Sequence, residues 1–311
     1  MAKLLDDARI FVAGHRGLVG SAICRALRSN GYENLLERTR CDLDLTDTKA
    51  VSQFFNDERP DYVFLAAAKV GGIHANSMYP AEFMKENLLI EVNVIDAAWR
   101  YGTTKLLFLG SSCIYPKLVA QPISEDTLLS GQLEPTNEAY SIAKIAGLKM
   151  CDAYRQQHAF NAVSLMPTNL YGPGDNFNLE TSHVIPALIR KAHEAKITGA
   201  PQLIVWGSGT PRREFLHVDD LAEATIFCMG HYDDAGHINV GVGQDISIKE
   251  LAVLISKIVG YSGDVVFDDT KPDGTPRKVL NVDRLSALGW TSRIALRDGL
   301  KATYRWYLEN E

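Results

Sequence analysis

Near its start the chain carries three glycines between an apolar run and an amphipathic run. Residues 9–14 have the pattern of a buried β-strand, and residues 18–31 have helical periodicity that ends at a glycine. Gly14, Gly17 and Gly20 stand between them with G-x-x-G-x-x-G spacing. Glycines let a backbone approach a pyrophosphate closely, and a helix N-terminus favours its negative charge. The segment therefore predicts a dinucleotide site, although a tight turn that needs positive φ would use the same residues.

Strands and helices alternate through the first 167 residues. The expected strands after the first are 34–40, 61–68, 105–110 and 161–167, and the expected helices are 46–60, 79–102 and 137–158. Thr46 or Asp47 is the expected cap of the helix 46–60. This alternation predicts an α/β fold with a Rossmann-type doubly wound parallel sheet and helices on both faces.

The pattern loosens after residue 167, where Gly, Pro, Asn and Thr become frequent. Loops at the carboxyl ends of parallel strands are where such sheets bind ligands. We therefore expect a smaller C-terminal substrate-binding lobe that closes over the sheet. The expected division gives 1–167 plus about 214–243 to the dinucleotide-binding domain, and about 168–213 plus 244–311 to the lobe.

Composition excludes several classes of partner. The 311 residues carry a net charge of −6 with no basic run, which argues against nucleic acid. No apolar run is long enough to span a membrane, and the start lacks the order of a signal peptide. The five cysteines form no CxxC pair, which favours a reducing compartment over a disulfide framework or zinc site. We expect a cytoplasmic protein without a metal, in which Asp219 and Asp220 of "HVDD" begin a helix.

The residues that end the second expected strand select the dinucleotide. An NAD site usually has Asp or Glu there to bind the ribose 2′-hydroxyl. This chain has Arg38 and Arg40, and the glycine loop carries Arg16. A guanidinium binds the 2′-phosphate of NADP with two hydrogen bonds. Glu37 would favour NAD only if it faced the ribose, so NADPH/NADP+ is the expected cofactor.

Tyr140 and Lys144 lie four residues apart, on one face of an expected helix. A tyrosine with its ordinary pKa of about 10 is a poor acid at neutral pH, and a neighbouring ammonium lowers that pKa. Ser111 or Ser112, at the end of the preceding strand, is placed to bond a substrate oxygen. A Y-x-x-x-K pair alone recurs by chance, but after a glycine loop and a strand that ends in serines it indicates an acid–base site, in which the lysine can also hold the nicotinamide ribose.

The order of the glycine loop, Ser111 and the Tyr140–Lys144 pair resembles the extended short-chain dehydrogenases/reductases. Within that group "GHRGLVGSAI", "FLGSSCIYPK", "EPTNEAYSIAKIAG", "SHVIPALI" and "KPDGTPRK" are similar to the GDP-L-fucose synthases, and the likeness runs from residue 9 to about 307. The resemblance implies that GDP-4-keto-6-deoxy-D-mannose is epimerised at C3 and C5 and then reduced at C4 by NADPH, which gives GDP-L-fucose. It also implies a homodimer through helices 79–102 and 137–158, whose apolar faces core packing explains equally well.

Cys113 and His183 are the residues to which the resemblance assigns proton transfer at C3 and C5. Cysteine and histidine have ordinary pKa values of about 8.5 and 6.5, so each can hold or release a proton near neutral pH. Ser111 and Tyr140 would polarise the C4 oxygen, and Tyr140 would donate a proton to it during reduction. Without the resemblance, a cysteine after a strand is more often a packed core residue.

The resemblance also implies a wider set of binding residues. For the cofactor these are Gly14, Arg16, Gly17, Leu18, Val19, Gly20, Arg40, Asp42, Leu43, Leu109, Gly110, Ser111, Ser112, Tyr140, Lys144, Pro167, Asn169, Leu170 and His183. For the substrate they are Asn169, Lys191, Trp206, Arg213 and Asp273. The family position of Lys191 is often arginine, so we expect a looser contact there.

Two other functions compete with this one. A redox-neutral nucleotide-sugar epimerase or 4,6-dehydratase of the same superfamily usually holds NAD tightly, and dehydratases tend to carry an acidic pair where this chain has Cys113. A non-catalytic NADP-sensing regulator could share the fold, since fold alone does not fix function. Such regulators tend to lose the tyrosine and lysine that this chain keeps.

Overall fold

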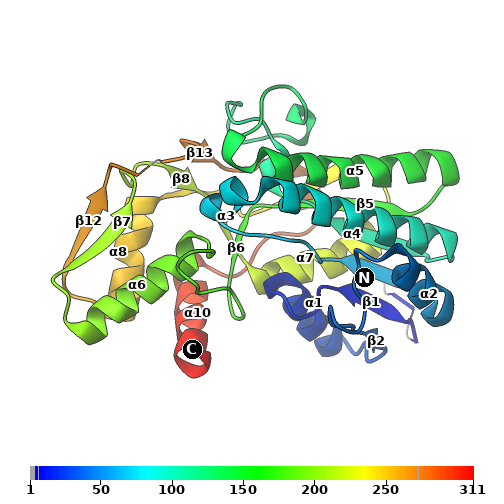
Figure 1. Cartoon of the computed structure of the whole chain (residues 1–311), viewed down its shortest axis with the longest axis horizontal. Helices are drawn as coiled ribbons and strands as arrows, with labels where there is room; N and C mark the ends of the chain where they lie inside the picture. The colour runs from blue at the N-terminus through cyan, green and yellow to red at the C-terminus, as the bar shows by residue number, and fades with distance from the viewer. Residues whose placement is uncertain (1–3, 6, 272) are drawn as a thin grey trace.

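The computed structural model describes residues 4, 5, 7–271 and 273–311. Figure 1 shows two units side by side: a helix-covered sheet that contains the N-terminal half of the chain, and a smaller unit that contains the C-terminal helix α10 (Leu296–Asn310). The chain passes between the units more than once. It builds β7 (Gln202–Trp206) in the smaller unit before β10 (His237–Val240) returns to the large sheet.

The large sheet has six parallel strands in the order β10-β5-β4-β3-β1-β2. Besides β10 they are β1 (Ile10–Ala13), β2 (Leu35–Leu36), β3 (Tyr62–Leu65), β4 (Lys105–Leu109) and β5 (Ala162–Pro167). Every residue of β1, β3, β4, β5 and β10 is buried, as expected for a parallel sheet covered on both faces. The strand order reverses direction around β1 and β3, and open α/β sheets bind ligands at the carboxyl ends of strands at such a point.

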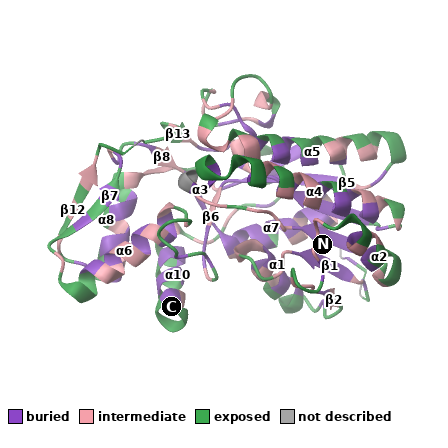
Figure 2. Ribbon diagram, viewed as in Figure 1, coloured by how far each residue is buried: buried purple, intermediate pink, exposed green. Residues whose placement is uncertain are grey.

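Helices cover both faces of the sheet (Figures 1 and 2). One hydrophobic core joins the sheet to α1 (Leu18–Ser29) and α7 (Val218–His231). A second core joins its other face to α2 (Thr48–Glu58), α4 (Pro80–Arg100) and α5 (Glu138–His158). The prediction of a doubly wound α/β fold is confirmed.

The smaller unit packs helices and short strands around its own core. It contains α6 (Val184–Thr198), α8 (Ile248–Val259), α10, β7, β8 (Arg212–Arg213), β11 (Ile246–Ser247), β12 (Asp264–Asp268) and β13 (Arg277–Lys278). β7 pairs with β12, whereas β8 lies between β11 and β13. The remaining elements are β6 (Asn169–Tyr171), paired with β9 (Phe215–His217), α3 (Ile73–Met78), α9 (Asp283–Ala287) and the 3₁₀ turns Ser112–Ile114, Glu125–Thr127 and Pro135–Asn137.

The second predicted strand, 34–40, is wrong beyond Leu36, where β2 ends. The next side chains are polar and pair with neighbouring helices: Glu37 with Arg28 of α1, and Arg38 with Glu58 of α2. These ion pairs hold the segment against helices α1 and α2.

Helix starts were predicted with mixed success. Asp47 is the cap of α2, as one of the two alternatives proposed, because its carboxylate accepts hydrogen bonds from the amides of the next turn. Asp219 and Asp220 lie in the first turn of α7, as expected, but neither is its cap: the helix starts at Val218, and the ring of His217 accepts a hydrogen bond from the Asp219 amide at 3.2 Å. The Asp220 carboxylate instead accepts from two backbone amides of the segment before α10.

Two observations bear on partners. No helix in the described part of the chain is both long and apolar enough to cross a membrane. Across the same residues, no group of three or more His, Cys, Asp or Glu side chains is arranged to hold a metal ion. The chain crosses between the two units at the carboxyl edge of the large sheet, which is where open α/β sheets bind ligands.

Candidate active site

A cavity of about 840 Å³ opens at the carboxyl ends of the central strands. From the large unit it is lined by the glycine loop after β1 and by residues 66–72, 109–113, 140, 144 and 167–170. From the smaller unit and its connections it is lined by residues 181–183, 213, 274, 275, 277 and 278. A cavity walled by both units at the switch point of an open sheet is a typical ligand site.

The glycine loop is packed too tightly for side chains. Gly14 has a φ of +86°, and a Cβ there would lie 2.8 Å from the Cα of Ala67, just after β3. A Cβ on Gly20 would overlap the carbonyl of Gly14. α1 begins after Gly17, which supplies no side-chain cap to the first amides of the helix. These amides and the helix dipole make a site for an anion such as a pyrophosphate.

The side chains after β2 divide between the cavity and α1. Glu37 is not among the cavity-lining residues, and its carboxylate accepts a hydrogen bond from Arg28 at 2.6 Å. Arg38 and Arg40 do line the cavity. The Arg40 side chain is 71% exposed, with Glu86 3.4 Å away. The acid that would favour NAD is held against α1, while two cations border the cavity.

Most of the predicted cofactor residues are brought together here. Gly14, Gly17, Leu18, Val19, Gly20, Arg40, Leu43, Leu109, Gly110, Ser111, Ser112, Tyr140, Lys144, Pro167, Asn169, Leu170 and His183 all line the cavity. Arg16 and Asp42 do not. The Asp42 carboxylate instead accepts hydrogen bonds from the amide and hydroxyl of Thr39, at 3.0 and 2.6 Å, and so stabilises the turn after β2.

Tyr140, in the first turn of α5, is hydrogen-bonded to Ser111 beyond the end of β4. Desolvation raises the pKa of the Tyr140 phenol above its ordinary value, the nearby Cys113 and Glu91 raise it further, and the Ser111 hydrogen bond lowers it. The predicted lowering of this pKa by Lys144 is not what the structure shows, because the Lys144 ammonium is paired with Glu91. A phenol in this state keeps its proton at neutral pH and can donate it.

Lys144 is buried one turn further along α5. Its ammonium donates to the carbonyl oxygen of Leu109 at 3.1 Å and lies 3.1 Å from the Oε1 atom of Glu91. It also lies 4.8 Å from the ring centre of Phe108. The Lys144 side chain is only 2% exposed, so an acid, a carbonyl group and an aromatic face replace the water around this cation.

Cys113 lies in the 3₁₀ turn that follows β4. The Oγ atom of Ser111 accepts a hydrogen bond from the Cys113 amide at 3.2 Å, which fixes the turn. The Cys113 sulfur accepts a hydrogen bond from the Asn137 side chain at 3.3 Å and lies 3.6 Å from the Lys278 ammonium. An ammonium and an amide donor are thus in contact with the sulfur, and both would stabilise negative charge that develops on it during a reaction.

Sequence reasoning missed Asn137 and Lys278. Asn137 immediately precedes the helix of Tyr140, and Lys278 ends the segment "KPDGTPRK", but neither position signals a cysteine partner. The Lys278 contact exists only because β13 of the smaller unit lies near the start of α5 (Figure 1).

His183 caps the N-terminus of α6 and lines the same cavity as Cys113. Its ring is open to the cavity, but the surrounding protein displaces bulk water and lowers the pKa of His183 below its ordinary value of 6.5. The imidazole is therefore neutral before a ligand binds. A ligand that brings negative charge into the cavity would favour the imidazolium.

The predicted substrate residues form two groups. Asn169 and Arg213 line the cavity, where the Asn169 side chain donates to the carbonyl oxygen of Glu214 at 2.8 Å. Lys191, Trp206 and Asp273 lie outside its lining, at the end of β7 and its neighbours. Lys191, Trp206 and Asp273 therefore belong to a surface beside the cavity, next to its lining residue Gly274.

Trp206 forms the centre of that surface. Trp206 is 59% exposed. The Lys191 and Lys271 ammonium groups lie 4.9 and 5.7 Å from its ring centre. Asp273 accepts hydrogen bonds from the amide and hydroxyl of Ser208, both at 2.7 Å. An exposed aromatic face with two cations beside it suits a flat base that carries phosphates.

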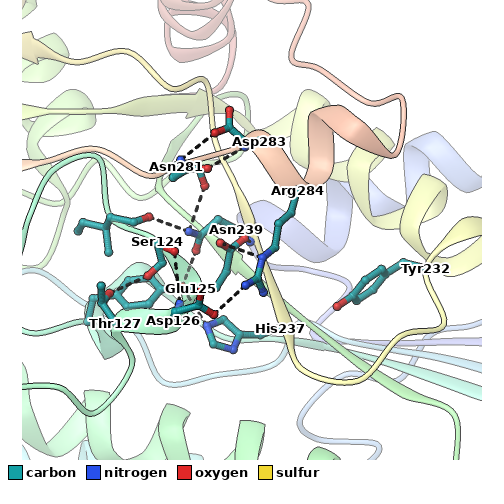
Figure 3. A network of polar contacts seen from close by, with 12 residues as sticks. Ser124, Glu125, Asp126, Thr127, Tyr232, His237, Asn239, Asn281, Asp283 and Arg284 are labelled. Carbon is teal, nitrogen blue, oxygen red and sulfur yellow. Dashed lines mark hydrogen bonds and ion pairs between the residues drawn. The ribbon is translucent and has the colours of Figure 1, made fainter.

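Behind the cysteine turn, Tyr115 joins a buried polar network, most of which Figure 3 labels. The Tyr115 hydroxyl donates to the Oδ1 atom of Asn239 at 2.5 Å and lies 3.0 Å from the Nε2 atom of His237. The backbone amide of Asn239 donates to the Glu125 carboxylate at 3.0 Å, and Arg284 lies 3.6 Å from the same carboxylate. Burial lowers the pKa of His237 to about 4. The network anchors the cysteine turn to β10.

Comparisons with known proteins agree over the whole chain. The profile of the NAD-dependent epimerase/dehydratase family matches residues 10–241. The putative GDP-L-fucose synthase 2 of Arabidopsis thaliana is 61% identical over 99% of this chain and 94% of its own length. The GDP-L-fucose synthase of Escherichia coli (strain K12) is 57% identical over 99% of this chain and 98% of its own length. A solved GDP-L-fucose synthetase from Naegleria fowleri bound to NADP has a TM-score of 0.92 at 31% identity, over 99% of this chain and 95% of that one.

Proposed function

The chain belongs to the NAD-dependent epimerase/dehydratase family, and we propose that it converts GDP-4-keto-6-deoxy-D-mannose to GDP-L-fucose. It is an NADP-dependent oxidoreductase with epimerase activity, and relatives of 57% and 61% identity are named GDP-L-fucose synthase and putative GDP-L-fucose synthase 2. One observation carries the proposal: Ser111, Cys113, Tyr140, Lys144 and His183 line a single cavity beside the glycine loop.

Epimerisation needs proton transfer at the two carbons that flank the C4 ketone. The ketone acidifies the hydrogens on C3 and C5, and Ser111 and Tyr140 stabilise the negative charge that develops on its oxygen. Cys113, held between Asn137 and Lys278, removes a proton from one face of the sugar. His183 protonates the opposite face, because the phosphates and the enolate favour its imidazolium form.

Reduction uses the same ketone-binding pair. NADPH, when bound, supplies the hydride that adds to C4. Tyr140, whose phenol is still protonated at neutral pH, donates its proton to the C4 oxygen as the hydride adds to C4. Lys144 binds the nicotinamide ribose. Ser111 keeps its hydrogen bond to the oxygen throughout, so no substrate movement is needed between the stages.

The cofactor site fits a phosphorylated dinucleotide. The glycine loop and the open amides of α1 hold the pyrophosphate. Arg40, with Arg38, binds the 2′-phosphate, which requires Arg40 to leave Glu86 and Arg38 to leave Glu58. Glu37 does not compete, because Arg28 holds it against α1. The preference for NADPH over NADH follows from these charges.

The GDP moiety extends from the cavity onto the surface around Trp206. The guanine stacks on the Trp206 ring, and Lys191 and Arg213 bind the phosphates. Asn169 contacts the sugar near the nicotinamide, and Asp273 accepts a hydrogen bond from the nucleotide after release from Ser208. The smaller unit, about 168–213 plus 244–311, is thus the GDP-sugar-binding lobe, and 1–167 plus about 214–243 is the NADP-binding domain.

A homodimer through α4 and α5 completes the proposal. These helices pack side by side over one face of the sheet, and Figure 2 shows that their outer surfaces are not uniformly buried. Val92 of α4 and Ile142 of α5 are 47% and 41% exposed. Pairing of two copies would cover these side chains in a four-helix interface, which light scattering can detect.

Incubation of the purified protein with GDP-4-keto-6-deoxy-D-mannose and NADPH, with NMR of the product, tests the function. The expected product is GDP-L-fucose, formed with stoichiometric oxidation of NADPH. A product that retains its configuration at C3 and C5, or unchanged substrate, would contradict the proposal. Asp96→Asn, which alters a carboxylate of α4 that does not line the cavity, is the control that should form the same product as the unaltered protein.

A further inference from the structure

An ion pair is buried between α4 and α5, the two long helices that pack side by side on one face of the large sheet. Glu91 of α4 and Lys144 of α5 are 1% and 2% exposed, and 3.1 Å separates their charged atoms. In the sequence Glu91 is an isolated acid in the apolar run "LLIEVNVI". Neither the cavity lining nor the roles given above include it.

The chain makes room for this carboxylate with a glycine. A Cβ on Gly147, in the interior of α5, would lie 2.6 Å from the Oε2 atom of Glu91 and 2.6 Å from the edge of the Phe108 ring. Glycine weakens a helix interior relative to alanine, so its presence there reflects the close approach of α4 and β4. The absence of a side chain at Gly147 lets the Glu91 carboxylate come within reach of the Lys144 ammonium.

Stability alone does not account for the pair. Removing two charges from water costs about as much free energy as their attraction returns, so a buried ion pair is rarely more stable than well-packed apolar side chains. The pair is better explained by what it does to Lys144, whose ammonium also donates to the Leu109 carbonyl. The carboxylate of Glu91 on α4, through the ion pair, and the Leu109 carbonyl on β4, through the hydrogen bond, define the position of a long and otherwise mobile side chain.

We propose that Glu91 is a positioning residue that holds the Lys144 ammonium between the Leu109 carbonyl and the cofactor ribose. The inference rests on the proposed function for the roles of Lys144 and Tyr140. Glu91 also acts on Tyr140, since its charge is one of the causes that raise the pKa of the phenol. Burial raises the pKa of Glu91 itself, and the Lys144 ammonium opposes that shift.

The test is a double-mutant cycle with NADPH affinity as the first readout. Glu91→Gln keeps the size of the side chain and removes its charge, and Lys144→Met removes the cation. Glu91→Gln should raise the Kd for NADPH, measured by fluorescence titration, about tenfold, or about 1.4 kcal/mol. In the Lys144→Met background the same change should alter the Kd less than about twofold, because residues that act through one contact are not additive.

The second readout is the kcat for reduction of GDP-4-keto-6-deoxy-D-mannose, which should fall about tenfold in Glu91→Gln, or about 1.4 kcal/mol in the barrier. Asp96→Asn is the matched control. Asp96 is another α4 carboxylate that bridges to α5, since it accepts a hydrogen bond from Tyr154 at 2.9 Å. Its loss should change thermal stability without changing the Kd or the kcat.

The outcomes separate the inference from the proposed function. Failure of the unaltered protein to form GDP-L-fucose overturns the function, while the NADPH cycle still reports on Glu91. A Kd and kcat within about twofold of wild type in Glu91→Gln, or equal losses in both backgrounds, overturns the positioning role. Should Glu91→Gln not fold, Glu91→Asp replaces it. This variant keeps the charge but moves it away from Lys144, so it should lose less NADPH affinity, and the loss should again disappear in the Lys144→Met background. An equal loss of affinity in both backgrounds contradicts the inference.

Discussion

The Lys278 ammonium lies 3.6 Å from the sulfur of Cys113, across the cavity between the two units. Lys278 belongs to β13 of the smaller unit, whereas Cys113 follows β4 of the large sheet. A thiol at the end of a strand is usually inert packing, but this one has beside it an ammonium that can stabilise negative charge on the sulfur. The position of the smaller unit therefore bears on the acid–base chemistry of the large one.

Lys278→Gln should make the Cys113 sulfur less reactive. We expect alkylation of Cys113 by iodoacetamide at neutral pH to slow about tenfold, because the ammonium that stabilises negative charge on the sulfur is lost. Mass spectrometry of the Cys113 peptide measures the rate. Cys41, which is exposed and distant from Lys278 in the sequence, is the internal control and should react at an unchanged rate. Equal rates for Cys113 in both proteins would show that the contact has no effect on the thiol.

Arg40→Ala tests the cofactor preference. The variant should lose about 1.5–3 kcal/mol of NADPH binding, the range for a hydrogen bond to a charged group, and NADH binding should barely change. Titration with each cofactor measures the difference. Arg25→Ala, which removes an arginine of α1 that pairs with Asp219 instead, is the control. An equal loss for NADPH and NADH would place Arg40 away from the 2′-phosphate.

Tyr140→Phe keeps the ring and removes the proton donor. Reduction of the C4 ketone should collapse while NADPH still binds, because the hydroxyl acts mainly in the transition state. Single-turnover absorbance of NADPH follows the reduction, and fluorescence titration follows binding. Reduction at a rate near that of the wild type would remove Tyr140 from the mechanism.

The large sheet and most of the site could be predicted because they depend on short-range patterns. The strand–helix alternation, the glycine loop and the Tyr140–Lys144 spacing are all local, and the structure brings them together around one cavity. Asp42 was expected near the cofactor, but a local turn with Thr39 occupies its carboxylate. Competition of this kind between nearby polar groups is not visible in residue order.

The contacts made by tertiary packing could not be predicted. Glu91 has the same sequence context as an apolar helix position, and only the approach of α5 at Gly147 makes it a partner of Lys144. Lys278 is far from Cys113 in the sequence and meets it only through the fold. The predicted second strand failed for the same reason, since the ion pairs of Glu37 and its neighbours with the helices end β2 early.

The buried network behind the cysteine turn makes stability depend on pH. His237 has a pKa of about 4 in the folded protein, against an ordinary value of 6.5. The unfolded chain therefore binds more protons between these values, so this contribution to stability is complete above pH 6.5 and is lost as the pH falls toward 4. The full loss is about 3 kcal/mol at most, at about 1.36 kcal/mol per pKa unit.

His237→Gln removes this titration. Urea unfolding of both proteins from neutral pH down to about pH 4.5 should show a smaller loss of unfolding free energy in the variant. The variant starts from a lower stability at neutral pH, because it loses the contact with the Tyr115 hydroxyl. Parallel curves for the two proteins would show that His237 does not titrate in this range.

The central claim is that the Cys113 thiol is the base of the epimerisation. Cys113→Ser keeps the size and hydrogen bonding of the side chain, but a serine hydroxyl does not ionise near neutral pH. Ser111, Tyr140 and Lys144 are unchanged, so reduction at C4 should survive while inversion at C3 and C5 fails. The variant should therefore form a GDP-6-deoxyhexose other than GDP-L-fucose.

The most direct measurement is NMR of GDP-4-keto-6-deoxy-D-mannose incubated with Cys113→Ser in D2O without NADPH. Proton exchange at C3 and C5 then reports the epimerisation chemistry alone, free of hydride transfer. We predict that deuterium enters both positions with the unaltered protein and that most of this incorporation is lost in the variant. Full exchange in Cys113→Ser at the wild-type rate, with GDP-L-fucose formed once NADPH is added, would show that the thiol is only packing and would contradict this account.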